Sequence, residues 1–174
     1  MTMLSTDALT ELITGAYRPG PYQLPDGRVL NEYFDPYHLT GDPQRLREVA
    51  RALAVLLPTD TEALAGPALA AVPLAAAVAL HTGLPTAYLR PAAKHHGTHR
   101  QVEGADLRAR RTVLLDDTAR TGANLLRGAA ALRESGALVT GAVCILDRNA
   151  GAAALLADQG LALASLLRDA GRCG

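Results

Sequence analysis

The most constraining feature of this sequence is the stretch Arg110–Leu126, which reads RRTVLLDDTARTGANLL near the middle of the chain. Its apolar run, Thr112–Leu115, has the length and the β character of a strand that is buried on both faces. Asp116 and Asp117 end this strand, and the turn Thr118–Gly122, rich in hydroxyls and small residues, follows them. A helix is expected to begin directly after that glycine. Backbone N–H groups in such a turn and at a helix N-terminus both favour a bound anion, so the stretch predicts a phosphate site.

The two adjacent carboxylates restrict the kind of phosphate ligand. Asp116 and Asp117 would repel a phosphate unless they face hydroxyl groups or a Mg²⁺ ion carried by a diphosphate. This combination indicates a sugar phosphate. From the local residues alone, an ordinary strand–helix turn remains an alternative, with Asp117 as the helix cap and Asp116 in solvent.

Size and composition predict a single domain, residues 1–174, with a full hydrophobic core. The chain has 174 residues, of which 49% are hydrophobic. It has 17 basic and 17 acidic residues, so its formal net charge is zero and does not favour binding to nucleic acid or to a membrane surface. Cys144 and Cys173 provide neither a disulfide framework nor a metal-ligand spacing. The N-terminal residues lack a signal-peptide pattern, so we expect a cytoplasmic protein.

Alternating helix and strand patterns predict an α/β fold: a parallel-rich central sheet with helices on both faces and a ligand at the carboxyl ends of the strands. Helices are expected at residues 6–15, 42–57, 72–81, from 123 onward and at 150–159, the last closed by Gly160, and strands at residues 63–67, 85–90, 112–115, 138–146 and 161–167. Residues 17–22 are interpreted as a turn-rich connection. The Pro-Asp-Gly turn at residues 25–27 predicts a hairpin.

A second polar segment, Pro91–Gly104, follows the strand expected at residues 85–90. It contains Lys94, the only lysine of the chain. Its three histidines, His95, His96 and His99, have no carboxylate or cysteine at ligand spacing, which disfavours a metal site. A solvated basic loop without a catalytic role remains an alternative.

Arg148 follows the strand expected at residues 138–146. A planar guanidinium suits a planar acid, because it donates two parallel hydrogen bonds to it. A surface salt bridge beside the next helix is the alternative interpretation. Arg90, Asp116 and Arg148 each lie at or after the end of a predicted strand, so we expect them to meet at one edge of the sheet.

The segment LLDDTARTG resembles the phosphoribosyl-pyrophosphate (PRPP) loop of the type I phosphoribosyltransferases, which has hydrophobic residues, two acids and a turn rich in threonine and glycine. Within that superfamily the chain is most similar to the orotate phosphoribosyltransferases, over about Gly20–Arg168. The resemblance implies the type I phosphoribosyltransferase fold, with a small N-terminal hood of about residues 17–40, joined by a C-terminal part, and a core of about residues 41–168. It also implies transfer of the 5-phosphoribosyl group from PRPP to orotate with release of pyrophosphate, a step of pyrimidine nucleotide biosynthesis.

The resemblance assigns roles to individual residues. Catalysis would fall to Lys94, in a mobile loop, and to Asp116 and Asp117. PRPP would be bound by residues of two loops, Arg90, Lys94, His96, Asp116, Asp117, Thr118, Ala119, Arg120, Thr121, Gly122, Ala123 and Asn124. The base would contact Tyr33, Phe34, Arg120 and Arg148, although both aromatic residues could instead be core residues of the hood. Mg²⁺ is the expected cofactor, held mainly by PRPP, and a homodimer with loop exchange is the expected assembly.

Several positions depart from the family pattern. Pro25, Ala70 and Pro91 stand where this family usually has lysines, and Arg120 stands where it usually has a threonine. We hypothesise that Arg120 compensates for one of the lost cations.

These departures leave two alternative functions open. One is phosphoribosyl transfer to a different base, which Pro25 and Arg120 favour. The other is a non-catalytic PRPP or nucleotide sensor. Retention of Lys94 and Arg148 argues against a sensor, because binding of a phosphate alone requires neither residue.

Overall fold

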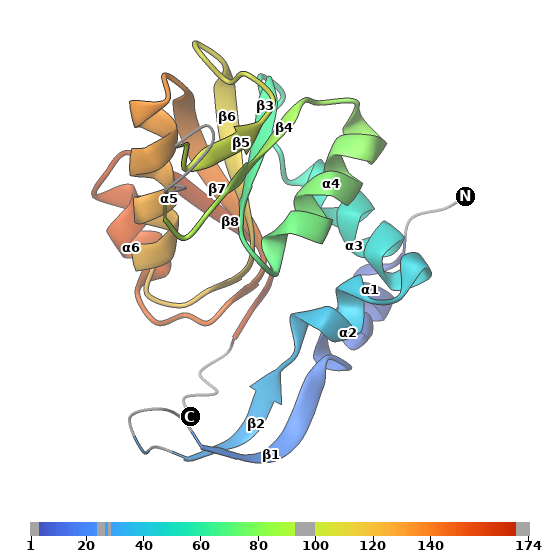
Figure 1. Cartoon of the computed structure of the whole chain (residues 1–174). Coiled ribbons are helices and arrows are strands. Elements are labelled where there is room, and N and C mark those ends of the chain that lie inside the picture. Colours follow the sequence, from blue (N-terminus) through green and yellow to red (C-terminus); the bar gives the residue numbers. More distant parts are fainter. Residues whose placement is uncertain (1–3, 24–26, 28, 93–99, 170–174) are drawn as a thin grey trace.

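The computed structural model describes residues 4–23, 27, 29–92 and 100–169, and its centre is a six-stranded sheet (Figure 1). The strand order is β5-β4-β3-β6-β7-β8, in which β5 is antiparallel to β4 and all other neighbours are parallel. The strands are β3 Ala63–Pro67, β4 Thr86–Leu89, β5 Val102–Gly104, β6 Arg111–Ala119, β7 Leu138–Asp147 and β8 Ala162–Arg168. The prediction of a parallel-rich α/β sheet is therefore confirmed.

Helices cover both faces of this sheet, as predicted (Figure 1). One layer contains α1 Thr6–Thr14, α3 Pro43–Val55 and α4 Ala71–Thr82, the other contains α5 Ala123–Glu134 and α6 Ala152–Ala157, and the short α2 Pro36–Thr40 precedes α3. Side-chain alternation along β6 explains the two layers, because Val113 and Leu115 pack on the side of α3 and α4 whereas Leu114 packs on the side of α5. None of the helices among the described residues has the length and apolar character needed to cross a membrane.

The N-terminal hood contains a separate antiparallel pair, β1 Tyr17–Gln23 and β2 Val29–Phe34, which projects from the rest of the molecule (Figure 1). The predicted hairpin is confirmed, but the interpretation of residues 17–22 as a connection was wrong, because they form β1. Pro19 and Pro21 are accommodated because the pairing register shifts between Pro19 and Tyr22, where ladder hydrogen bonds are interrupted. Pro25 lies outside the described residues.

The helices expected from residues 6 and 42 begin as predicted, because the side chains of Ser5 and Asp42 accept hydrogen bonds from the first turns of α1 and α3. The strand predicted to end at Leu115 instead continues through both acids, because β6 stays paired with β7 as far as Ala119. Tertiary pairing thus extends a strand beyond its apolar run.

The last predicted helix was too long at both ends. α6 ends at Ala157 with Asp158 as its C-cap, so Gly160 is not the cap; it follows with a φ of +70° in the turn that leads to β8. Two short elements, α2 and β5, were not predicted, since neither is long enough to show a hydrophobic period.

Candidate active site

The topology of the sheet places a cleft beside the acidic pair. After β3 the chain forms β4 and β5 on one side, and β6, the other neighbour of β3, is followed by β7 and β8 on the opposite side. Open α/β sheets bind ligands at such a reversal of strand order, beyond the carboxyl ends of the strands. A cleft of about 540 Å³ lies there, lined by Pro67–Ala70 at the end of β3, Arg90 after β4, and Asp116 and Asp117 of β6. Arg90 and the two acids therefore meet in one cleft as predicted, whereas Arg148, which was expected at the same edge, does not line it.

Asp116 and Asp117 differ in their surroundings. Asp116 is 8% exposed, and its Oδ1 accepts a hydrogen bond from the backbone N–H of Asp117 (2.9 Å). Burial raises the pKa of the Asp116 carboxyl to about 8, and the side chain and charge of Asp117 act in the same direction. Asp117 is partly exposed and accepts a hydrogen bond from Thr118 Oγ1 (3.3 Å). Such a pair is suited to bind hydroxyl groups, and a cation in the cleft would favour its ionised form.

The loop between β6 and α5 depends on Gly122. This residue has a φ of +83°, and an added Cβ would lie 3.0 Å from Leu156 Cδ1 and 3.2 Å from the backbone of Ala152, so glycine permits the close approach to α6. The Ala152 N–H donates to the carbonyl of Arg120 (3.2 Å), which fixes the other end of the loop. As the N-cap of α5, Gly122 has no side chain to accept hydrogen bonds from the first turn, which leaves N–H groups there for an anion.

A second set of backbone N–H groups borders the cleft after β3. An added Cβ on Gly66 would lie 2.9 Å from the carbonyl oxygen of Ala71, so glycine allows the chain to turn sharply into α4. The peptide bond between Ala68 and Leu69 is cis. Ala70 is the N-cap of α4 and offers no side-chain hydrogen bond, so this helix also presents its N-terminus to the cleft.

The polar loop after β4 is anchored at its two ends. The N–H of Arg90 donates to the carbonyl of Gln101 (2.9 Å), and Nε2 of Gln101 donates to the carbonyl of Arg90 (3.2 Å). Both residues line the cleft, so the loop starts and ends at its edge. Lys94 and His96, which the sequence assigns to this loop, lie outside the described residues.

Arg127, rather than Arg120, brings its side chain to the cleft. Arg120 is exposed and does not line the cleft, and its side chain makes no hydrogen bond or ion pair within the described part of the chain. Asn124, Arg127 and Gly128 share one face of α5 and all border the cleft, and Arg127 Nη2 donates a hydrogen bond to Asn124 Oδ1. Arg127 and Gly128 lie three and four residues after Asn124, and this helical spacing is the sequence signal that identifies Arg127.

The other residues expected to bind PRPP are divided between the cleft and its surroundings. Thr118 and Asn124 line the cleft. Ala119 is buried at the end of β6, whereas Thr121 and Ala123 are exposed at the loop and the first turn of α5. Only backbone groups of Ala119 and Ala123 can therefore serve a ligand.

The two hood aromatics have different environments. Phe34 is 5% exposed and packs edge-on against the ring of Tyr17, with 5.4 Å between centroids, so it belongs to the core as the alternative interpretation proposed. Tyr33 is 45% exposed. Partial burial and then the charge of Asp117 raise the pKa of the Tyr33 hydroxyl, although Tyr33 does not line the cleft. Tyr37, which the sequence analysis missed, lines the cleft itself.

Arg148 lies directly after β7 and beside the phosphate loop. Its backbone N–H donates to the carbonyl of Ala119 (2.8 Å). Its side chain is ion-paired with Asp169, with 3.2 Å between Nε and Oδ2. The guanidinium therefore has a protein partner already, and its position next to the hood is consistent with the expected base site.

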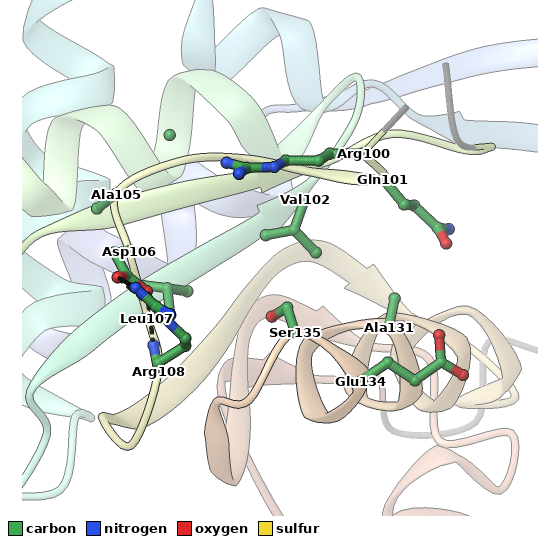
Figure 2. Close-up of a pocket in the computed structure, with 11 residues that line it drawn as sticks. Arg100, Gln101, Val102, Ala105, Asp106, Leu107, Arg108, Ala131, Glu134 and Ser135 are labelled. Atoms are coloured by element: carbon green, nitrogen blue, oxygen red, sulfur yellow. Dashed lines mark hydrogen bonds and ion pairs between the residues drawn. The ribbon is translucent and has the colours of Figure 1, made fainter. Parts of the chain in front are cut away.

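A second cavity, of about 610 Å³, lies between β5 with its flanking segments and the C-terminal half of α5 (Figure 2). Figure 2 shows Val102 and Arg100 on one side and Ala131 and Glu134 on the other. Its exposed Arg108 is paired with Asp106, with 2.6 Å between Nη2 and Oδ2. The described residues that line this cavity include no adjacent carboxylate pair and no helix N-terminus, which are the groups that make the 540 Å³ cleft suitable for a sugar phosphate.

No group of three histidine, cysteine, aspartate or glutamate residues that could hold a metal ion occurs within residues 4–23, 27, 29–92 and 100–169. His95, His96 and His99 lie outside these ranges. The cleft offers the two carboxylates Asp116 and Asp117, and this donor set fits a Mg²⁺ ion that takes most of its ligands from substrate oxygens.

Comparison with known proteins agrees with this geometry. Residues 39–159 match the family model described as "Phosphoribosyl transferase domain". An orotate phosphoribosyltransferase of Nocardioides sp. is 40% identical over 151 residues, which cover 87% of this chain and 84% of that protein.

Solved structures show the same relationship. The crystal structure of orotate phosphoribosyltransferase from Aeropyrum pernix has a TM-score of 0.78 and 35% identity, covering 94% of this chain and 92% of the other. The Mycobacterium tuberculosis orotate phosphoribosyltransferase in complex with PRPP has a TM-score of 0.81 and 25% identity, covering 94% and 95%. The sequence, the fold and the cleft lead to the same conclusion: this chain belongs to the orotate phosphoribosyltransferases of the type I phosphoribosyltransferase superfamily.

Proposed function

We propose that the protein transfers the 5-phosphoribosyl group from PRPP to orotate and releases pyrophosphate, as a step of pyrimidine nucleotide synthesis. The observation that carries this proposal is the cleft in which Asp116 and Asp117 lie between Pro67–Ala70 and the first turn of α5. Two sets of backbone N–H groups flank a carboxylate pair. This arrangement suits a ligand with a phosphate group at each end and hydroxyl groups between them.

In the proposed reaction, a ring nitrogen of orotate forms a bond to the anomeric carbon of the ribose. The bond from that carbon to the pyrophosphate oxygen breaks, and its electron pair leaves with pyrophosphate. The transition state resembles an oxocarbenium ion, as in glycoside chemistry. Asp116 and Asp117 would bind the ribose hydroxyls, and their negative charge would favour the positive charge that develops on the ring. Residues Thr118–Asn124 would bind the 5′-phosphate.

The leaving pyrophosphate requires cations. Arg90 and Arg127 are the arginines that line the cleft among the described residues, and we assign to Arg127 the compensating role expected of Arg120. Lys94 and His96 would join them when the polar loop closes, and closure would also exclude water that would hydrolyse PRPP. A Mg²⁺ ion bound to PRPP would neutralise part of the charge on the diphosphate.

We further propose a cytoplasmic homodimer in which the loop that bears Lys94 closes over the neighbouring subunit's site, each chain forming one domain of residues 1–174. Helix α4 supports an interface. The helix is rich in alanine, valine and leucine, and its Leu80 is 89% exposed. An exposed leucine on an apolar helix is typical of a surface that a second subunit covers.

The proposed function is tested by measuring pyrophosphate release from PRPP, Mg²⁺ and orotate, in parallel with the Lys94→Ala variant. Release that depends on both orotate and Lys94 is the expected result. PRPP binding without release would contradict transfer to orotate and would favour a different base or a PRPP sensor. Absence of PRPP binding would contradict both.

A further inference from the structure

The ion pair of Arg148 is part of a network that joins distant parts of the chain. The Tyr17 hydroxyl donates a hydrogen bond to Asp169 Oδ1 (2.9 Å), while Asp169 Oδ2 lies 3.2 Å from Arg148 Nε. Arg148 Nη1 closes the network by donating to the Tyr17 hydroxyl (3.4 Å), and the guanidinium carbon lies 5.8 Å from the centroid of the Tyr17 ring. Strand β1 of the hood and the ends of β7 and β8 thus meet at three side chains.

Asp169 is the fixed member of this network. It is 6% exposed, and its backbone N–H donates to the carbonyl of Asp147 (2.8 Å). None of the described residues donates a hydrogen bond to Oδ2, so the guanidinium of Arg148 compensates the charge there. Since a buried carboxylate without a cation is costly, Asp169 strongly favours one position of Arg148.

Tyr17 holds the other oxygen of the same carboxylate. Burial, and next the hydrogen bond to Asp169, raise the pKa of Tyr17 to about 12, so its hydroxyl remains a donor at neutral pH. The Tyr17 ring is itself fixed by its edge-on contact with buried Phe34. The hood therefore contributes to the placement of an arginine that belongs to the main sheet.

The network leaves one part of the guanidinium for a ligand. Arg148 uses Nε toward Asp169 and Nη1 toward Tyr17, whereas Nη2 makes no hydrogen bond within the part of the chain that the structure describes. The Arg148 side chain is 21% exposed, so it still reaches the surface. A planar acid approaching the tip would meet a guanidinium whose plane is set before binding.

We propose that Asp169 is a positioning residue that, together with Tyr17, orients Arg148 and thereby sets the preference for a base that carries a carboxylate. This inference rests on the proposed function. Orientation in advance lowers the conformational cost of binding an acidic base, because Arg148 has fewer arrangements to lose. Binding of a base with the same ring but no carboxylate is not strengthened by this orientation of Arg148.

The test compares orotate with uracil, the same ring without the carboxylate, in the wild type and in Asp169→Asn. The asparagine keeps the size of the side chain and removes its charge. We expect the orotate KM to rise about tenfold, the KM for PRPP to remain within about twofold, and the activity with uracil to be unchanged. The ratio of kcat/KM for orotate to that for uracil should therefore fall about tenfold. A purely structural role would lower both activities equally and would contradict the proposal, as would a lower orotate KM.

A double-mutant cycle with Arg148→Gln shows whether Asp169 acts through Arg148. The double variant should have the orotate KM of Arg148→Gln alone, whereas additive effects would overturn the proposal. Tyr17→Phe removes only the hydroxyl and should shift the selectivity ratio in the same direction by a smaller factor, so it decides the question if Asp169→Asn does not fold. Selectivity that is lost in Arg148→Gln but kept in both other variants overturns this inference alone. Selectivity kept even in Arg148→Gln overturns it together with the proposed base site.

Discussion

The two sides of the proposed active site are built in different ways. Most of the phosphate side, Asp116–Arg127, is one continuous segment in which a strand end, a turn and a helix follow one another, and Pro67–Ala70 and Arg90 complete the cleft from β3 and β4. The base side combines Tyr17 with Arg148 and Asp169, which lie 131 and 152 residues further along the chain. Local geometry therefore determines the phosphate side, and the order of strands in the sheet determines the base side. Substitutions on the two sides should separate into effects on PRPP and effects on the base.

The largest effect is expected on the phosphate side, for Asp117→Asn. Loss of the charge beside the developing oxocarbenium ion should lower kcat by about a hundred- to a thousandfold without loss of thermal stability, as measured by pyrophosphate release. Asp106→Asn is the matched control, because it changes an acid of the second cavity. A large loss of kcat in Asp106→Asn and none in Asp117→Asn would contradict this assignment and place the reaction in the second cavity.

On the base side, the adjacent aromatics Tyr33 and Phe34 should respond in opposite ways. Phe34→Ala removes a buried ring and should lower the free energy of unfolding by about 3 kcal/mol, measured by denaturant titration. Tyr33→Ala removes a half-exposed ring and should leave stability nearly unchanged while it raises the orotate KM. Equal losses of stability in the two variants would mean that Tyr33 is also a core residue.

Two arginines of the phosphate side provide a smaller and more selective test. Arg127→Ala should weaken binding of Mg²⁺-PRPP by about tenfold in calorimetry, because it removes a cation from the cleft. Arg120→Ala should bind PRPP almost as well as the wild type, since its exposed side chain lies outside the cleft. Weaker PRPP binding in Arg120→Ala than in Arg127→Ala would instead identify Arg120 as the compensating cation.

The last expected effect is a dependence of stability on pH that comes from Asp116. Its pKa is raised, so between about pH 4 and pH 8 the folded protein binds more protons than the unfolded chain and this contribution to stability falls as the pH rises. Asp116→Asn cannot ionise, so its stability relative to the wild type should rise as the pH increases over this range. Parallel curves of melting temperature against pH for the two proteins would contradict this assignment.

The sequence was sufficient to predict the phosphate side because each part of it has a local signature. The apolar run before Asp116, the turn ending at Gly122 and the helix after it all occur where expected. The end of the strand was misplaced, since pairing of Ala119 with Asp147 involves a segment that local patterns do not include. Arg127 was not predicted because it lies beyond the loop motif, in the next turn of α5 on the face that borders the cleft.

The base side was less predictable for a physical reason. Nothing near Asp169 in the sequence indicates that it will be buried against Arg148 and Tyr17, because that contact exists only once β7 and β8 lie side by side and the hood packs on their ends. Similarly, Phe34 and Tyr33 are both aromatic, and only the alternation of β2 against the rest of the hood decides which one is buried. The sequence therefore identified aromatic and charged residues on the base side, but it did not show which of them are buried or which contact one another.

The most direct test of the division between the two sides is the pair of Michaelis constants of Arg148→Gln. Steady-state rates would be measured with orotate varied at saturating PRPP, and with PRPP varied at saturating orotate. We predict that the orotate KM rises at least about tenfold while the PRPP KM stays within about twofold of the wild type. A rise in the PRPP KM of the same size, or an unchanged orotate KM, would contradict the assignment of the base to the side formed by Tyr17, Arg148 and Asp169.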